Sequence, residues 1–162
     1  AWSIAPGLVR PKSRGRVTLA SADPQDIAKV DGAFLSHPDD VKALLRGIEI
    51  CREIGNSSQM KDFVKREVMP GKLSGEDMAN FLRNAAGTYF HESCTCKMGR
   101  DEMSVVDGKL SVRGVEGLSI ADASVMPQVS TGNTMAPTVI IGERMADVLV
   151  KRVRKRQVAP ST

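Results

Sequence analysis

Residues 88–99 read TYFHESCTCKMG, residues 105–127 read VVDGKLSVRGVEGLSIADASVMP, and residues 128–137 read QVSTGNTMAP. These segments contain His91, one of only two histidines, and a Gly-Asn turn that ends at Asn133. Short apolar runs between turn residues are typical of strands. The rest of the chain is interpreted as support that places His91 and Asn133 in one site.

Within this stretch the patterning predicts a hairpin over 105–112, centred on an Asp-Gly turn. A short apolar strand is expected over 118–121, before the polar loop 127–133. A helix is predicted to begin near Pro137 and to run to about Arg154. Its first part is apolar nearly all round, which predicts burial inside something larger.

Upstream of this stretch the pattern predicts a small number of short elements. These are strands over 16–19 and 28–35 and helices over 38–55, about 57–64 and 75–86. Ser36 is expected to cap the first helix, whose opening turn holds Pro38 and two acidic residues. His37 is interpreted as a residue of the cap region, and Cys51 as a buried thiol on the apolar stripe of that helix.

The composition excludes several classes of protein. With 41% hydrophobic residues among 162, the chain can bury a core and is not disordered. No apolar run reaches the length of a membrane span. The net charge of +4 is concentrated in a C-terminal basic run, Lys151, Arg152, Arg154, Lys155 and Arg156. We interpret that run as a solvated helix end, with an anionic membrane surface as the alternative. It has no interleaved aromatic residues, so no nucleic-acid partner is predicted.

The cysteines indicate a reduced, cytoplasmic environment, and a peripheral membrane location stays open. Their number is odd, and the Cys94-Thr95-Cys96 spacing does not fit a disulfide framework or a zinc site. No metal site is predicted. A thiol or metal enzyme built on Cys94 and Cys96 is the weakest of the functional alternatives.

His91 and Asn133 are the candidate catalytic residues, although each also fits a purely structural role. Gly-x-Gly-x-x-Gly, Walker, Gly-x-Ser-x-Gly and His-Glu-x-x-His motifs are all absent. A neutral imidazole can take a hydroxyl proton, and an amide can orient the oxygen. Asn133 stands just before the predicted helix, and the N-terminus of a helix favours negative charge. Together these groups suit the oxidation of an alcohol.

The motifs YFHESCTCKMG, VVDGKLSVRGVEGLSIADASVMP and STGNTMAPTVIIGERMADVL resemble the C-terminal portion of a glucose–methanol–choline (GMC) oxidoreductase. The segments RPKSRGRVTLASADP and MPG add a weaker upstream match. Together the matches cover nearly the whole chain and point to the choline dehydrogenase-like branch. The resemblance implies an α+β / α/β fold. Residues 1–104 would be mostly substrate domain, with an antiparallel sheet and helices. Residues 105–156 would return to the FAD-binding domain with a strand and a helix, and 157–162 would be a tail.

The resemblance also implies roles. His91 corresponds to the base that takes the substrate hydroxyl proton, and Asn133 to the second active-site position. Asp122 and Ala123, with Asn133, Thr134 and Met135, correspond to the stretches beside the cofactor, which is FAD. The implied reaction is hydride transfer from a primary alcohol, choline-like or other, to the flavin, which gives an aldehyde. The electron acceptor is O2 or a quinone.

The family's Gly-rich motif for the ADP moiety is not present in this chain. We therefore expect a fragment that binds FAD poorly and is inactive by itself. Its partner would be the missing N-terminal part. The alternative is a catalytically inert module that pairs with itself or with another chain through the apolar helix.

Overall fold

The computed structural model describes residues 2–158, and side chains for residues 2–154. The last four residues of the predicted tail, 159–162, lie outside the described residues, as does Ala1. The chain divides into two compact units, Ala1–Thr88 and Tyr89–Thr162. The described residues form three α-helices, one 3-10 helix and a two-stranded antiparallel sheet, so the α+β class is confirmed.

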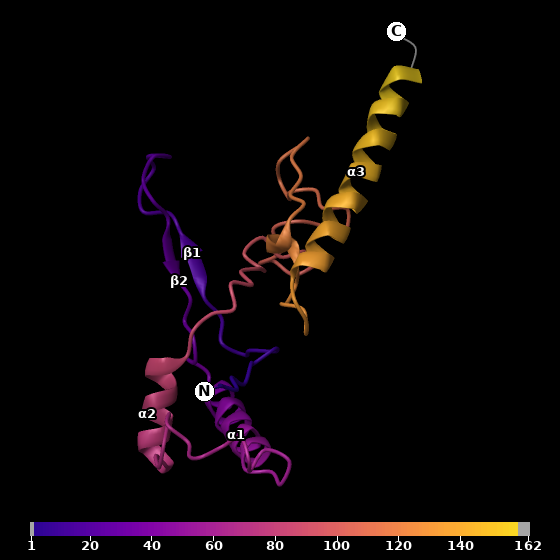
Figure 1. Cartoon of the computed structure of the whole chain (residues 1–162). Coiled ribbons are helices and arrows are strands. Elements are labelled where there is room, and N and C mark those ends of the chain that lie inside the picture. The colour runs from indigo at the N-terminus through magenta and orange to yellow at the C-terminus, as the bar shows by residue number, and fades with distance from the viewer. Residues whose placement is uncertain (1, 159–162) are drawn as a thin grey trace. The chain divides into compact units, whose positions relative to one another are not determined.

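The first unit contains a short hairpin and two helices (Figure 1). Strand β1 (Arg16–Thr18) pairs with β2 (Lys29–Asp31), with Val17 opposite Val30. The predicted second strand is shorter than expected because Ala33 and Leu35 have φ of 44° and 55°, which ends the extended backbone. Helix α1 covers Pro38–Gly55 and helix α2 covers Gly75–Ala85.

Helix α1 has the predicted bounds, but its N-cap lies one residue later than predicted. The N-cap is His37 and not Ser36, since His37 Nδ1 accepts the N–H of Asp39 at 3.2 Å. Asp40 is 2% exposed and ties the N-terminal segment to this helix. Its carboxylate accepts the N–H groups of Lys12 and Ser13, both at 2.8 Å, and the Ser13 hydroxyl at 2.5 Å. The helix ends at Gly55, with Asn56 as its C-cap, as the Gly-Asn pair predicts.

Helices α1 and α2 pack against each other through a small apolar interface that includes Val41, Met78 and Leu82, each at most 6% exposed. The prediction of a helix over 57–64 is wrong, because residues 57–63 form consecutive hydrogen-bonded turns instead. Phe63 on that segment is 75% exposed, so no packing offsets the nucleation cost of so short a helix. Cys51 is half-buried rather than buried.

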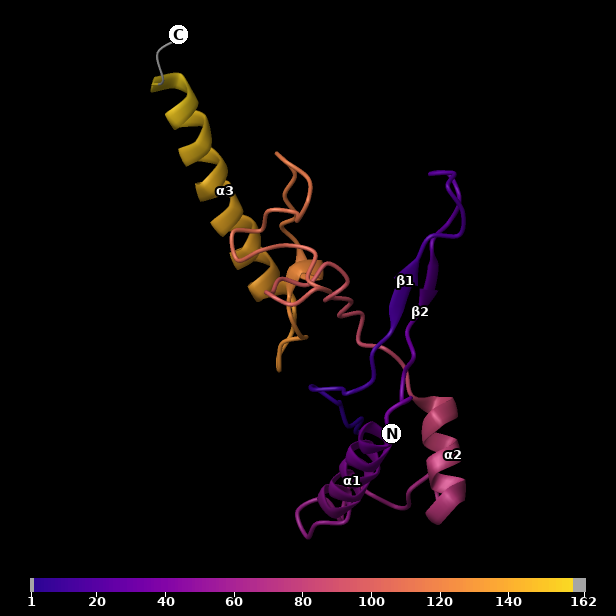
Figure 2. The same ribbon diagram turned by 180° about the vertical axis from the view of Figure 1, so that it is seen from behind.

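The second unit is built of loops that pack on one long helix. Helix α3 covers Met135–Val158, so it begins two residues before the predicted start and continues beyond Arg154. Figures 1 and 2 show the loops of this unit gathered along the first half of α3. The core consists of Val106 and Val125, both fully buried, with Leu110 and Met145 around them. The 3-10 helix η1 (Ala123–Val125) supplies Val125 to this core.

The predicted hairpin and strand of this unit are reduced to single bridges. Val106 pairs with Val112, and Ser111 pairs with Ser119, both antiparallel. Asp107 accepts the N–H groups of Lys109 and Ser111, which turns the chain before regular strands can form. Residues 118–121 therefore form no strand of their own, although Ile120 still packs against the core.

None of the described helices is both long enough and apolar enough to cross a bilayer. Of the C-terminal basic run, Lys151, Arg152 and Arg154 are exposed on α3. The side chains of Lys155 and Arg156 lie outside the described residues.

Candidate functional site

The structure brings His91 and Asn133 together across 42 residues of sequence. Nε2 of His91 lies 3.2 Å from Oδ1 of Asn133, within hydrogen-bonding distance. His91 is half-buried and Asn133 is exposed, so both residues have surface that solvent can reach. The pair therefore offers a ring nitrogen and an amide at a single accessible point, as the sequence predicts.

His91 lies on an irregular segment, residues 89–98, which we call the His91 segment. Its main chain is held by η1, since the N–H groups of Cys94, Cys96 and Met98 donate to three successive carbonyls. These bonds measure 3.3 Å to Ala123, 2.9 Å to Ser124 and 2.8 Å to Val125. Val125 is fully buried, so the segment is attached to the core of the second unit.

Asn133 lies two residues before the first turn of α3. Thr134 accepts the N–H and the hydroxyl of Thr138, at 3.0 and 2.7 Å, which closes the start of the helix. That first turn contains no acidic residue. The N–H groups of Asn133, Met135 and Ala136 have no acceptor among the described residues. Such donors at a helix N-terminus attract negative charge.

Asp122 and Ala123 lie at the start of η1. The Asp122 carboxylate accepts the Ser124 N–H at 2.8 Å and so caps this 3-10 helix. The main-chain N–H groups of Asp122 and Ala123 have no acceptor among the described residues. Together with the start of α3, they give the unit two sets of unpaired donors. A cofactor such as FAD, with anionic phosphates and carbonyl oxygens, fits these donors.

Two carboxylates of this unit are engaged in structural bonds. The Lys97 ammonium at 2.9 Å and then the Ser104 hydroxyl lower the pKa of Asp101 to about 2. The N–H groups of Ser111 and Lys109 lower the pKa of Asp107. Both side chains are therefore ionised at neutral pH and occupied by fixed donors. Neither is suited to carry a proton in catalysis.

The alternatives based on metal or thiol chemistry receive no support from the described residues. No three His, Cys, Asp or Glu side chains within residues 2–154 are grouped so that they could hold a metal ion. Cys94 and Cys96 are free and half-buried, and the Cys94 thiol donates to the Ser93 hydroxyl at 3.3 Å.

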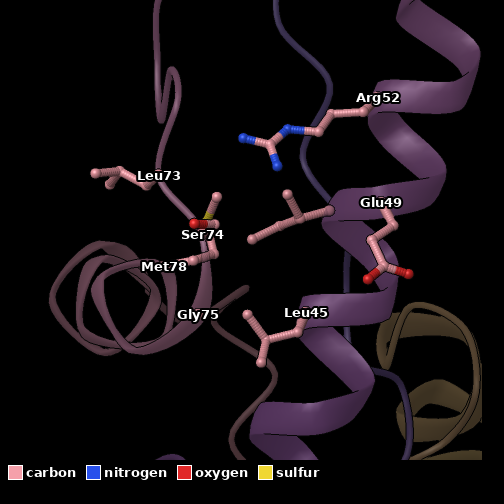
Figure 3. A pocket seen from close by; sticks show the side chains of 8 residues that line it. Leu45, Glu49, Arg52, Leu73, Ser74, Gly75 and Met78 are labelled. Atoms are coloured by element: carbon pink, nitrogen blue, oxygen red, sulfur yellow. The ribbon is translucent and has the colours of Figure 1, made fainter.

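A shallow pocket in the first unit lies between α1 and the start of α2 (Figure 3). Leu45 and Arg52 project from α1 toward Ser74 and Met78, and Glu49 also lines the pocket. The Arg52 guanidinium is already bound by the Glu67 carboxylate, at 3.1–3.2 Å, and by the Gly71 carbonyl at 2.7 Å. Because its one cation is paired, this pocket offers little to bind a charged ligand.

Two features of the site were not predicted from the sequence. One is the ladder, by which we mean the three main-chain hydrogen bonds from the His91 segment to η1, and the other is the capping role of the Asp122 side chain. The ladder joins main-chain groups about 28 residues apart, which side-chain patterning does not encode. The Asp122-Ala123-Ser124 order is an available local signal, because Asp often accepts the N–H two residues ahead. That signal could have predicted the cap.

Comparison with known proteins identifies the family of the chain. A family model for the C-terminal domain of GMC oxidoreductases matches residues 11–142. An alcohol dehydrogenase (acceptor) of Pseudomonas putida is 43% identical over 145 residues, which are 88% of this chain and 26% of that protein. An oxygen-dependent choline dehydrogenase of Pseudomonas aeruginosa is 42% identical over 156 residues, 95% of this chain and 27% of that protein.

A solved structure of an FAD-dependent oxidoreductase from Chaetomium thermophilum superposes with a TM-score of 0.83 at 31% identity. The match covers 90% of this chain and 26% of that one. The chain thus spans about a quarter of the length of the relatives that it matches. Because this family model matches most of the chain, the chain belongs to the GMC oxidoreductase family.

Proposed function

We propose that this chain is the C-terminal part of an FAD-dependent enzyme that oxidises a primary alcohol to an aldehyde. The observation that carries the proposal is the 3.2 Å contact between His91 Nε2 and Asn133 Oδ1 beside the unpaired N–H groups of α3. Membership of the GMC family, and relatives named for alcohol and choline oxidation, support it.

In the proposed reaction His91 takes the proton of the substrate hydroxyl. Asn133 orients the oxygen, which needs the amide turned so that its nitrogen faces the substrate. Bound FAD would supply the acceptor for the hydride that leaves the alcohol carbon. Loss of the hydroxyl proton to His91 and of that hydride would together leave an aldehyde.

The residues proposed to lie against the cofactor are Asp122, Ala123, Asn133, Thr134 and Met135. At each of them the main-chain N–H has no acceptor among the described residues, which suits contact with negatively charged or carbonyl oxygens. The positive end of the α3 dipole lies at the same place and stabilises negative charge on a group bound there.

The substrate class is a small primary alcohol, with choline as one candidate. Tyr89 and Phe90 flank His91 and are 61% and 79% exposed. Exposed aromatic faces attract a quaternary ammonium group through cation–π interaction. The electron acceptor is O2 or a quinone. A panel of primary alcohols, each assayed with O2 and with a soluble quinone, distinguishes these alternatives in the full-length enzyme.

Substitution of His91 in the full-length enzyme tests the proposal. His91→Ala should lower kcat by roughly 10²–10⁴-fold, the range expected for a lost general base. The matched control is His37→Asn at the only other histidine, which keeps a side-chain acceptor at the cap of α1 and should leave kcat unchanged. Equal rates for the wild type and His91→Ala would remove His91 from the mechanism.

We further propose that the chain alone is catalytically inert, because it contains no Gly-rich motif for the ADP moiety. Purified chain mixed with FAD should retain little flavin after gel filtration. Stoichiometric binding with a flavin absorption spectrum would contradict this.

A second candidate function is a module without catalytic activity that pairs with itself or with another chain. The observation in its favour is the exposed apolar surface of α3, where Val139 is 54% and Ile140 62% exposed. Sedimentation of the purified chain distinguishes the two. A stable dimer without flavin favours the module, whereas a monomer favours the first proposal.

The exposed Lys151, Arg152 and Arg154 also allow a peripheral contact with anionic lipid. Co-sedimentation with vesicles that contain phosphatidylserine, compared with neutral vesicles, tests this contact.

A further inference from the structure

We propose that the Asp122 side chain is a positioning residue for His91. By capping η1, it fixes the carbonyls that hold the His91 segment and so fixes the place of the imidazole. The inference rests on the proposed role of His91 as the base. It adds to the contact proposed for the Asp122 main chain, since it concerns the carboxylate, which faces the Ser124 N–H.

The His91 segment needs support from outside itself. It contains no helix and no strand, and its one bridge is at Met98. Two of its residues that are not glycine, Phe90 and Cys94, have φ of 58° and 73°. Left-handed backbone at such residues is costly and persists only where neighbouring contacts impose it. His91 lies between these two residues, so its position depends on those contacts.

The bonds from the segment to η1 are contacts of this kind. They reach Ala123, Ser124 and Val125 in order, and the Cys94 bond is the one nearest to His91. At the Met98 end, two further contacts hold the ladder in place. Val125 is fully buried, and the Lys97 carbonyl accepts the Val105 N–H at 3.0 Å. Toward His91, the segment is held by the bond from the Cys94 N–H to the Ala123 carbonyl and by the 3.2 Å contact between His91 and Asn133.

The near end of η1 depends on Asp122. A 3-10 helix of three residues has poor hydrogen-bond geometry and little stability of its own. Its internal bonds are long, 3.3 Å from the Val125 N–H to the Asp122 carbonyl and 3.2 Å from the Met126 N–H to the Ala123 carbonyl. The bond from the Ser124 N–H to the Asp122 carboxylate is the shortest, at 2.8 Å. Loss of this cap should release the Ala123 carbonyl first, and with it the Cys94 N–H.

Amide hydrogen exchange in the full-length enzyme tests the positioning without reference to activity. In Asp122→Ala, exchange at the Cys94 N–H should become roughly fivefold faster, as expected for a lost side-chain cap. Asp122→Asn keeps an oxygen acceptor and should restore most of the protection. Asp23→Ala is the matched control. Asp23 accepts the N–H two residues ahead, at 2.9 Å, in the other unit, and its loss should leave Cys94 unaffected.

Kinetics give the second readout, measured per bound flavin so that loss of cofactor does not count. Asp122→Ala should lower kcat roughly 10-fold to 100-fold with KM changed little, because a misplaced base slows the chemical step. Asp122→Asn should recover most of that rate. Unchanged Cys94 exchange in Asp122→Ala would overturn the inference. The inference would also be overturned if Asp122→Asn showed the exchange rate and the loss of kcat expected for Asp122→Ala. This second variant tests the inference even if Asp122→Ala does not fold.

The inference and the proposed function fail in different ways. If His91→Ala retains the wild-type rate, the proposed function fails. Faster exchange at Cys94 in Asp122→Ala then still establishes that Asp122 positions the segment. If His91→Ala is inactive while Asp122→Ala keeps both its exchange and its rate, the positioning role fails alone.

Discussion

The two histidines lie in regions of opposite character. The His37 region, residues 12–13 with 37–40, is a closed set of polar bonds. His37 Nδ1 accepts a main-chain N–H, the His37 N–H donates to the Ser13 hydroxyl, and the buried Asp40 accepts three bonds. The His91 region, residues 89–98 with 122–135, holds its histidine by irregular backbone. Within residues 2–154, the hydrogen-bonding contact of the ring is with the exposed amide of Asn133, and the N–H groups at the start of α3 have no acceptor there.

This difference separates a structural histidine from one that is available for chemistry. A side chain that caps a helix, as His37 does through Nδ1, contributes to stability, and its loss lowers the free energy of unfolding. A side chain that meets one exposed, exchangeable partner can bind a substrate atom in its place. The two regions should therefore respond to substitution in different measurements, and the predictions below test that separation.

The largest expected effect concerns the two Gly-Asn pairs of the chain, Gly55-Asn56 and Gly132-Asn133. Asn133→Ala in the full-length enzyme should lower kcat by roughly 10²–10³-fold, the usual cost of removing one donor from a site where charge develops. Asn56 donates to the Arg52 carbonyl at 2.9 Å and ends α1. Asn56→Ala should therefore leave kcat unchanged. Steady-state assays measure kcat for both variants. Equal kcat values for Asn133→Ala and Asn56→Ala would contradict the distinction between the His37 region and the His91 region.

Much of the first unit could be predicted from local sequence. Helix α1 follows from Val41, Leu45 and Ile48 at helical spacing after Pro38, and its end follows from the Gly-Asn pair. The same reasoning failed over 57–64, where Met60 and Phe63 also have helical spacing. Periodicity states which face of a helix would be apolar. It does not state whether another element lies there to cover it, and Phe63 is 75% exposed.

The second unit could be predicted only in part. Helix α3 could be predicted from its apolar pattern. Short runs such as 118–121 form no strands, because Asp107 and two glycines with positive φ, Gly114 and Gly117, turn the chain too often. The meeting of His91 with Asn133 spans 42 residues and follows from no local pattern. Family resemblance predicted that meeting, and its catalytic meaning stays a prediction until the substitutions are measured.

The second prediction concerns Asp40 in the His37 region. Asp40→Ala should lower the free energy of unfolding of the chain at pH 7 by about 1–3 kcal/mol, because three donors lose a buried acceptor. Trp2, the one tryptophan, lies 3.5 Å from the position that a Cβ on Gly55 would take, so its fluorescence reports on α1. Urea denaturation followed at Trp2 measures the change. A loss below about 0.5 kcal/mol would contradict the role given to Asp40.

The stabilisation by Asp40 should also depend on pH in a defined direction. Burial opposes ionisation of this carboxyl, but the Lys12 N–H, the Ser13 hydroxyl and the Ser13 N–H more than offset it and lower the pKa. The contribution is therefore fully present above the ordinary pKa of about 4 and is lost as the pH falls through the lower, folded-state value. The difference in free energy of unfolding between wild type and Asp40→Ala should narrow below about pH 4. A difference that widens there would contradict the predicted direction.

The smallest expected effect returns to His37 itself. His37→Ala removes the acceptor of the Asp39 N–H and should lower the free energy of unfolding by about 1 kcal/mol, as for other N-caps. His37→Ser supplies a hydroxyl acceptor and should restore most of the loss. Neither variant should change kcat in the full-length enzyme, because this ring serves only the start of α1. A loss of kcat in His37→Ala that His37→Ser does not restore would show that His37 also serves the reaction. That result would contradict the distinction between a structural His37 region and a catalytic His91 region.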